Sequence, residues 1–143
     1  MSDSITIVIP VPVSANVYWR TRVAGNRAIT YVSSEAKAFK EEIAMRLRIA
    51  GVVKPIEGRV MVRLDLYPHR PLDWEKRVKK MGEGWDDTVR CIDLDNAVKV
   101  TLDAMKGIAF LDDVWVRQII AQRMEPDGRA RAVVTISQWE KPK

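Results

Sequence analysis

The amino-acid sequence predicts an α+β fold with a mixed or antiparallel sheet and two main helices. Three observations support this prediction. Residues 59–67 alternate between apolar and polar side chains, residues 34–50 carry apolar side chains at helical spacing, and strands and helices do not alternate strictly along the chain. Because the chain has 143 residues, we expect a single domain over 1–143 with one core.

The N-terminal half predicts strands followed by a helix. Pro10 closes an apolar run rich in β-branched residues, and residues 25–26 (Gly-Asn) are typical of a turn. Ser33 or Ser34 can cap a helix that ends before Gly51. The expected elements are a strand at 5–9, a loop or second extended piece at 13–20, short strands at 18–22 and 28–32, and a helix at 34–50.

The C-terminal half predicts further strands and a second main helix. Residues 69–91 have no clean period and hold a basic cluster, so we expect an insertion-like excursion that is partly helical or mobile. The other expected elements are a half-buried strand at 59–67, a helix from Asp95 or Asn96 to Gly107, a strand at 114–123 with a helix as the alternative, a turn at 126–128, and a strand at 131–139. We expect the last two strands to form a hairpin.

Composition restricts the possible functions. The chain has 24 Lys and Arg against 19 Asp and Glu, a formal charge of +5, which favours an anionic partner such as nucleic acid or a membrane surface. No apolar run is long enough to span a membrane, and residues 1–4 provide no basic start to a secretory signal, so we expect a cytoplasmic protein. With only Cys91 and His69 as soft ligands, a disulfide and a Cys- or His-based metal site are excluded.

The main candidate site is an acidic motif just before the second helix. In an extended segment, residues two apart point to the same side, so Asp93 and Asp95 can present two carboxylates together. Two adjacent carboxylates repel each other, and a cation between them relieves this repulsion. Hard oxygen ligands favour Mg²⁺ or Mn²⁺.

Other residues extend this motif into a catalytic set. Lys99 lies one helical turn beyond Asp95 and can stabilise developing negative charge on a phosphate. Asp112 or Asp113 can supply a third carboxylate, and the spacing alone does not choose between them. This combination is what metal-assisted phosphodiester hydrolysis needs.

Simpler explanations exist for each of these residues. Asp95 or Asn96 can merely cap the helix. Residues Asp95, Lys99 and Asp103 form an i, i+4 ladder of the kind found on many solvated helix faces. The pair at 112–113 can be ordinary turn residues.

Three groups of motifs carry a resemblance to a known family. They are the Pro, Ser and Asn segment at 9–16 followed by Tyr18-Trp19-Arg20, the segment at 31–36, and the set Asp93-Leu94-Asp95-Asn96, Lys99, Asp103-Ala104, Gly107 and Leu111-Asp112-Asp113. Together these motifs resemble the RusA-type Holliday-junction resolvases, which are structure-selective endodeoxyribonucleases of phage and prophage origin. The resemblance runs through almost the whole chain.

The resemblance implies a compact α+β subunit that acts as a homodimer in recombination or repair. It implies symmetric paired cuts at four-way DNA junctions with Mg²⁺, for which Mn²⁺ can substitute, and it implies no small-molecule cofactor. Asp93, Asp95 and Asp113 match the catalytic and metal-binding carboxylates of the family, Lys99 matches its essential lysine, and Asp112 matches the assisting acid. Residues 69–91 form a longer segment than the shortest relatives have at this place.

Basic and aromatic residues are the candidate DNA contacts. Each of them can equally belong to an ordinary solvated surface. The basic candidates are Arg20, Arg22, Arg27, Lys76, Arg77, Lys79 and Lys80. Trp19, Trp74 and Trp85 can stack on unpaired bases, whereas core packing is the default for Trp19, Trp115 and Trp139.

Two other functions fit the same residues. A non-catalytic DNA-binding module would keep the basic surface and use the acidic residues as helix caps or for structural metal binding. A less selective nuclease would cut flaps or other branched DNA with the same catalytic set. Asparagine in place of Asp95 discriminates the first alternative, because only a nuclease would lose cleavage while keeping DNA binding.

Overall fold

The structure is a computed structural model that describes residues 4–143. Residues 1–3, which contributed to the expectation that no secretory signal is present, lie outside the described part. A four-stranded sheet has the strand order β1-β6-β4-β5. Its strands are β1 (Ile5–Ile9), β4 (Val60–Tyr67), β5 (Val116–Arg123) and β6 (Arg131–Gln138). Strand β4 runs antiparallel to β6 and parallel to β5, so the sheet is mixed, as the sequence predicts.

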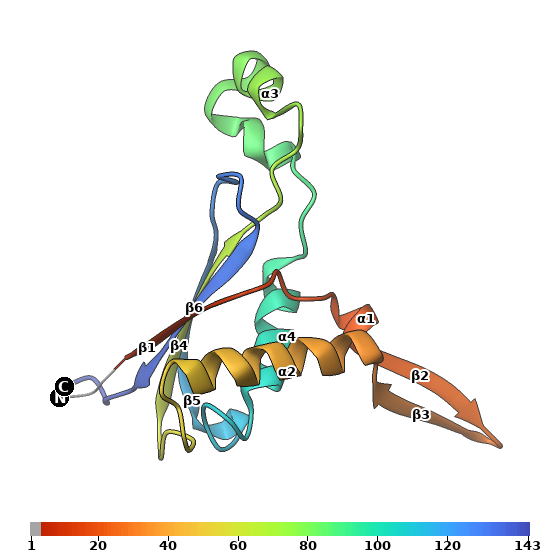
Figure 1. Cartoon of the computed structure of the whole chain (residues 1–143), viewed down its shortest axis with the longest axis vertical. Coiled ribbons are helices and arrows are strands. Elements are labelled where there is room, and N and C mark those ends of the chain that lie inside the picture. Colours follow the sequence, from red (N-terminus) through yellow and green to blue (C-terminus); the bar gives the residue numbers. More distant parts are fainter. Residues whose placement is uncertain (1–3) are drawn as a thin grey trace.

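Two long helices cover one side of this sheet. They are α2 (Ser34–Ile49) and α4 (Leu94–Met105) (Figure 1). Their apolar side chains join those of the strands in one hydrophobic core, in which Phe39, Ile43, Leu64 and Val100 are buried. The fold is therefore α+β, and its helices have a defined sheet face to pack against.

Two segments extend away from this core (Figure 1). One is the hairpin of β2 (Trp19–Ala24) and β3 (Arg27–Val32), which forms a separate two-stranded sheet. The other contains α3 (Trp74–Met81) and the 3₁₀ helix η1 (Gly82–Thr88); we call it the helical arm. The expectation of a partly helical excursion at 69–91 is thus confirmed.

Local sequence signals explain the most regular elements. The side chain of Ser33 accepts a hydrogen bond from the amide of Ala36 and caps α2, and Gly51 follows the helix with a φ of 98° that favours glycine. In β4, the alternating residues Val60, Val62, Leu64 and Leu66 are buried, as expected for a strand with one face on the core.

Two expectations about secondary structure were wrong. Residues within the segment 13–20 form the short helix α1 (Ala15–Tyr18), because the Ser14 side chain accepts a hydrogen bond from the amide of Val17. Strands β5 and β6 do not form a hairpin, because β4 lies between them. The chain passes through α4 and returns to the start of β4, where Val116 pairs with Val60 and makes β5 parallel.

No helix among residues 4–143 has the length and apolar character needed to cross a membrane.

Shortening a core side chain in the central strand should destabilise the fold. Leu64 is 1% exposed, so we expect Leu64→Ala to lower the free energy of unfolding by about 2–5 kcal/mol through lost burial and a residual cavity. Urea denaturation followed by circular dichroism measures this loss. Leu72 is fully exposed, and Leu72→Ala is the matched control, with an expected change within about 0.5 kcal/mol. Equal stability of the two variants would contradict the assigned core.

Candidate active site on helix α4

Helix α4 begins at Leu94, with its N-cap two or three residues earlier in the acidic motif than the sequence suggested. Asp93, not Asp95 or Asn96, occupies the N-cap position, and its side chain makes no capping hydrogen bond. Asp95 lies in the first turn. Both carboxylates are exposed, and within residues 4–143 neither takes part in a side-chain hydrogen bond or ion pair. They are therefore free to bind an external cation.

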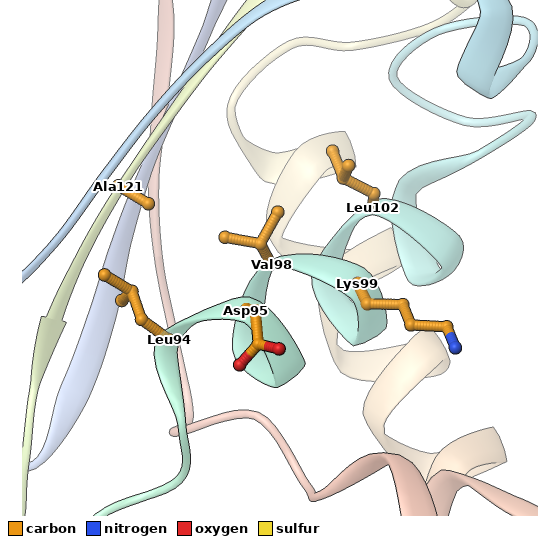
Figure 2. A pocket seen from close by; sticks show the side chains of 6 residues that line it. All are labelled: Leu94, Asp95, Val98, Lys99, Leu102 and Ala121. Atoms are coloured by element: carbon orange, nitrogen blue, oxygen red, sulfur yellow. The ribbon is translucent and has the colours of Figure 1, made fainter.

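The two faces of α4 have different roles. Ala97, Val100 and Ala104 are fully buried against the core. Asp95 and Lys99 are exposed, and Figure 2 shows both directed away from the side of the helix that carries Leu94 and Val98. Packing of the buried face thus fixes the direction in which the polar residues leave the helix.

The expected ladder of Asp95, Lys99 and Asp103 does not form as ion pairs in the described residues. The Lys99 ammonium lies 5.1 Å from the centre of the Trp19 ring, which is within cation–π range. Asp103 accepts a hydrogen bond of 2.5 Å from the Tyr18 hydroxyl. The Lys40 ammonium lies 3.8 Å from the same Asp103 carboxylate. Each of the last two ladder residues therefore has its partner on another element.

Burial affects two titratable groups near this helix. Burial, together with the hydrogen bond to Asp103 and the charge of its carboxylate, raises the pKa of Tyr18, so this phenol stays protonated and donates. Burial also raises the pKa of the Cys91 thiol. Because the thiolate is the nucleophilic form, this shift disfavours Cys91 as a nucleophile.

The second acidic pair lies at the other end of α4. Asp113 starts the short 3₁₀ helix η2 (Asp113–Trp115), and the Asp112 side chain accepts a hydrogen bond from its amide. The 12 residues of α4, about 18 Å of helix, separate this pair from Asp93. In the described part of one chain, no three acidic, histidine or cysteine side chains form a group that could hold a metal ion. A single chain thus keeps Asp112 and Asp113 apart from Asp93 and Asp95.

An apolar groove lies between α4 and β5, beside the acidic motif. Leu94, Val98 and Leu102 line it from the helix and Ala121 lines it from the strand (Figure 2). Strand β5 is at the edge of the sheet, and Ile119 and Ile120 are 45% and 40% exposed. The segment before it is also open, since Val114 is 73% exposed. We refer to the groove and these exposed residues as the β5 face.

The three arginines predicted to bind DNA near the N-terminus all lie on the β2–β3 hairpin. Arg20, Arg22 and Arg27 are exposed there. The guanidinium of Arg22 lies 5.9 Å from the centre of the Tyr31 ring. The hairpin starts at Trp19, the residue that contacts Lys99, so the first residue of the hairpin lies beside the site on α4 and Arg27 lies at the turn, at the opposite end of the hairpin.

The basic cluster predicted at 76–80 lies on α3, but only some of its side chains are exposed and unpaired. Lys76, Lys79 and Lys80 are exposed. Arg77 instead forms an ion pair of 2.9 Å with Asp73 and donates to the carbonyl and hydroxyl of Thr88. Arg77 therefore joins α3 to η1, while the three lysines remain available to an anionic partner.

Trp19 packs against the core as expected, whereas Trp85 and Trp115 are placed differently from the expectations. Trp85 is only 2% exposed and donates to the Glu125 carboxylate at 2.6 Å, so it attaches the helical arm to the sheet and cannot stack on a base. Trp74 carries the Arg70 guanidinium on its ring at 4.2 Å. Trp115 is 38% exposed, which contradicts core packing.

The sequence reasoning did not identify Tyr18 as a residue of this site, and it considered Trp19 only for base stacking or core packing. Their contacts join positions about 80 residues apart, and local spacing contains no signal for such pairs. The adjacency of two aromatic residues just before the hairpin was the only available hint.

Comparison with known proteins places this chain in a family. No curated protein matches the chain. The sequence model of one family, described as "Endodeoxyribonuclease RusA", matches residues 9–137. This range contains α1, the hairpin, the acidic motif and β5, and it covers most of the 143 residues. The chain therefore belongs to the RusA endodeoxyribonuclease family.

Proposed function

We propose that this protein is a divalent-metal-dependent endodeoxyribonuclease that resolves four-way DNA junctions by paired symmetric cuts in recombination or repair. The observation that carries the proposal is the exposed, unpaired state of Asp93 and Asp95 beside Lys99 in a chain of this family. Carboxylates that have no partner in the fold are available for chemistry on a bound substrate.

The donor set fits Mg²⁺, with Mn²⁺ as a substitute. Mg²⁺ is commonly held by one or two carboxylates together with waters and substrate phosphate oxygens. Asp93 and Asp95 supply two exposed carboxylates at the start of α4, one at the N-cap and one in the first helical turn rather than in the expected extended segment. When bound, the metal neutralises phosphate charge and lowers the pKa of water. A site made of oxygen donors binds hard metal ions such as these in preference to softer ones.

Asp93, Asp95 and Lys99 have different roles in the proposed reaction. Asp93 and Asp95 define the reacting end of α4, where the helix dipole favours the negative phosphate. In hydrolysis, a water oxygen bonds to phosphorus, the bond to the leaving oxygen breaks, and a proton passes to that oxygen. The Lys99 ammonium stabilises the negative charge that grows on the phosphate during this step.

A homodimer accounts for the distant acidic pair. The β5 face is apolar, and β5 is an edge strand with an unpaired outer side, which a second copy of the chain would cover. In a two-fold antiparallel arrangement, the start of one β5 approaches the end of the other. Since Ala121 lies in the groove with Asp95, Asp113 of one protomer then approaches the acidic motif of its partner, with Asp112 beside it.

DNA binding is assigned to the hairpin and the helical arm. Arg20, Arg22 and Arg27 lie on the hairpin, and Lys76, Lys79 and Lys80 lie on α3. In a dimer, each of these basic segments occurs twice around a two-fold axis, which matches the approximate two-fold symmetry of a four-way junction. Such a protein would act on DNA in the cytoplasm of a bacterial host.

Removal of one acidic charge should abolish cleavage and preserve DNA binding. We expect Asp93→Asn to lower the rate of cleavage of a labelled four-way junction by at least about 100-fold, because amide oxygens hold Mg²⁺ weakly. Binding measured in EDTA should stay unchanged. Wild-type protein should make symmetric paired nicks with Mg²⁺ and none with EDTA.

The same assay separates the alternatives. Equal cutting of linear duplex by the wild type would leave a nuclease without junction selectivity. Binding without cleavage across several divalent metals would instead contradict the enzyme. Glu57→Gln, which changes an exposed carboxylate away from α4, is the matched control and should cleave at the wild-type rate.

Subunit mixing tests whether Asp113 acts on the partner's site. Asp93→Asn and Asp113→Asn should each be inactive as homodimers. In a mixed dimer, the unchanged Asp93 of one chain meets the unchanged Asp113 of the other, so one of the two sites is intact. Refolding the two variants together should restore about a quarter of the wild-type nicking activity, since about half of the dimers are mixed. An inactive mixture would show that both carboxylates act within one chain.

The lysines of the arm should determine part of the salt dependence of binding. Each phosphate contact adds about 0.9 to the slope of log affinity against log salt concentration, so replacing Lys76, Lys79 and Lys80 by Ala should reduce this slope by about 2–3. Fluorescence anisotropy with a labelled junction in EDTA measures it. The control variant replaces Arg48, Lys54 and Lys141, three exposed cations away from the arm, and its slope should stay near that of the wild type. Equal slopes for both triple variants would rule out a specific role of the arm.

A further inference from the structure

Lys99 is placed where two carboxylates compete for its ammonium group. Asp95 and Asp103 lie four residues before and after it on α4, the spacing at which helix side chains of opposite charge pair. An ion pair with either residue would turn the ammonium along the helix axis. Yet among residues 4–143 Lys99 forms neither pair.

Residues of α1 and α2 contact Asp103, one of the two carboxylates that compete for Lys99. Tyr18 donates its hydroxyl to Asp103 at 2.5 Å, and the Lys40 ammonium approaches the same oxygen at 3.8 Å. Tyr18 is fully buried, so its hydroxyl is held in place by the packing around the ring. Asp103 thus has two partners and is a weak competitor for Lys99.

An aromatic face holds the ammonium itself. The Trp19 ring centre lies 5.1 Å from the Lys99 Nζ atom, and the ring packs edge-to-face on Tyr18 with centroids 4.4 Å apart. Trp19 is half-buried against the core, so its orientation is restricted. A cation–π contact leaves the N–H donors of the ammonium free, whereas an ion pair would use them.

We propose that Trp19 is a positioning residue for cleavage, which holds the Lys99 ammonium away from the neighbouring carboxylates and ready for the scissile phosphate. Tyr18 supports it by occupying Asp103. This inference rests on the proposed role of Lys99 in the nuclease reaction. It also connects the root of the DNA-binding hairpin to the catalytic helix, since β2 starts at Trp19 itself.

The test compares two substitutions at one position by single-turnover cleavage of a four-way junction. We expect Trp19→Leu to lower the cleavage rate about tenfold while affinity in EDTA changes less than about twofold, and Trp19→Phe to restore the rate to within about threefold of the wild type. The control is Trp139→Leu, which removes another half-buried tryptophan that lies beside Arg59 and Arg117, and it should cleave at the wild-type rate.

Two further measurements separate the possible failures. Lys99→Ala should be inactive; an active Lys99→Ala would overturn the catalytic role of the lysine itself. A wild-type rate for Trp19→Leu beside an inactive Lys99→Ala would overturn the positioning role alone, as would equal loss of rate in the Leu and Phe variants.

Nuclear magnetic resonance tests the contact without any cleavage. The ε-methylene protons of Lys99 should resonate upfield of the other lysine ε protons in the folded wild type because of the Trp19 ring current. A Lys99 signal at the ordinary lysine position would contradict the contact, whatever the stability of the variants.

Discussion

Packing of α4 into the hydrophobic core, through the buried residues Ala97, Val100 and Ala104, decides in which direction the polar residues of this helix point. Because an α-helix turns once every 3.6 residues, burial of this face directs Asp95 and Lys99 outward. The same packing makes α4 the crossover between β4 and β5, so that β5 runs parallel to β4 and forms an open edge of the sheet. The outward direction of the polar residues on α4 and the exposed apolar face of β5 thus both depend on the packing of this helix.

Local patterns were sufficient for the regular elements. The alternation of Val60, Val62 and Leu64 with polar residues predicted β4, because one face of this strand is buried and the other is open. A serine before an apolar helical stripe predicted the start of α2 for a similar reason, since the capping hydrogen bond spans only three residues. The acidic motif at the start of α4 was found because its members are close in sequence.

Features that depend on distant contacts were not predictable in this way. The sequence places Asp93 and Asp113 at opposite ends of a predicted helix, but it does not show whether one chain brings the two carboxylates together, and in the described residues it does not. The seven residues between β5 and β6 are long enough either to join two neighbouring strands or to pass over β4, which lies between them. The sequence therefore does not show where β5 lies in the sheet. The contact between Trp19 and Lys99 likewise joins two elements that only the folded core brings together.

The helical arm has a different relation to the core from the two long helices α2 and α4. Helix α3 buries none of its residues, and Trp85 of η1 is buried outside the main core cluster. Hydrogen bonds from Trp85 to Glu125 and from Arg123 to the carbonyls of Asp86 and Val89 join the arm to the end of β5. A segment attached in this way adds little to the stability of the sheet. Changes in the length or charge of the arm are therefore compatible with unchanged folding of α4. The DNA contacts proposed for the arm can therefore change while the acidic motif of α4 stays the same.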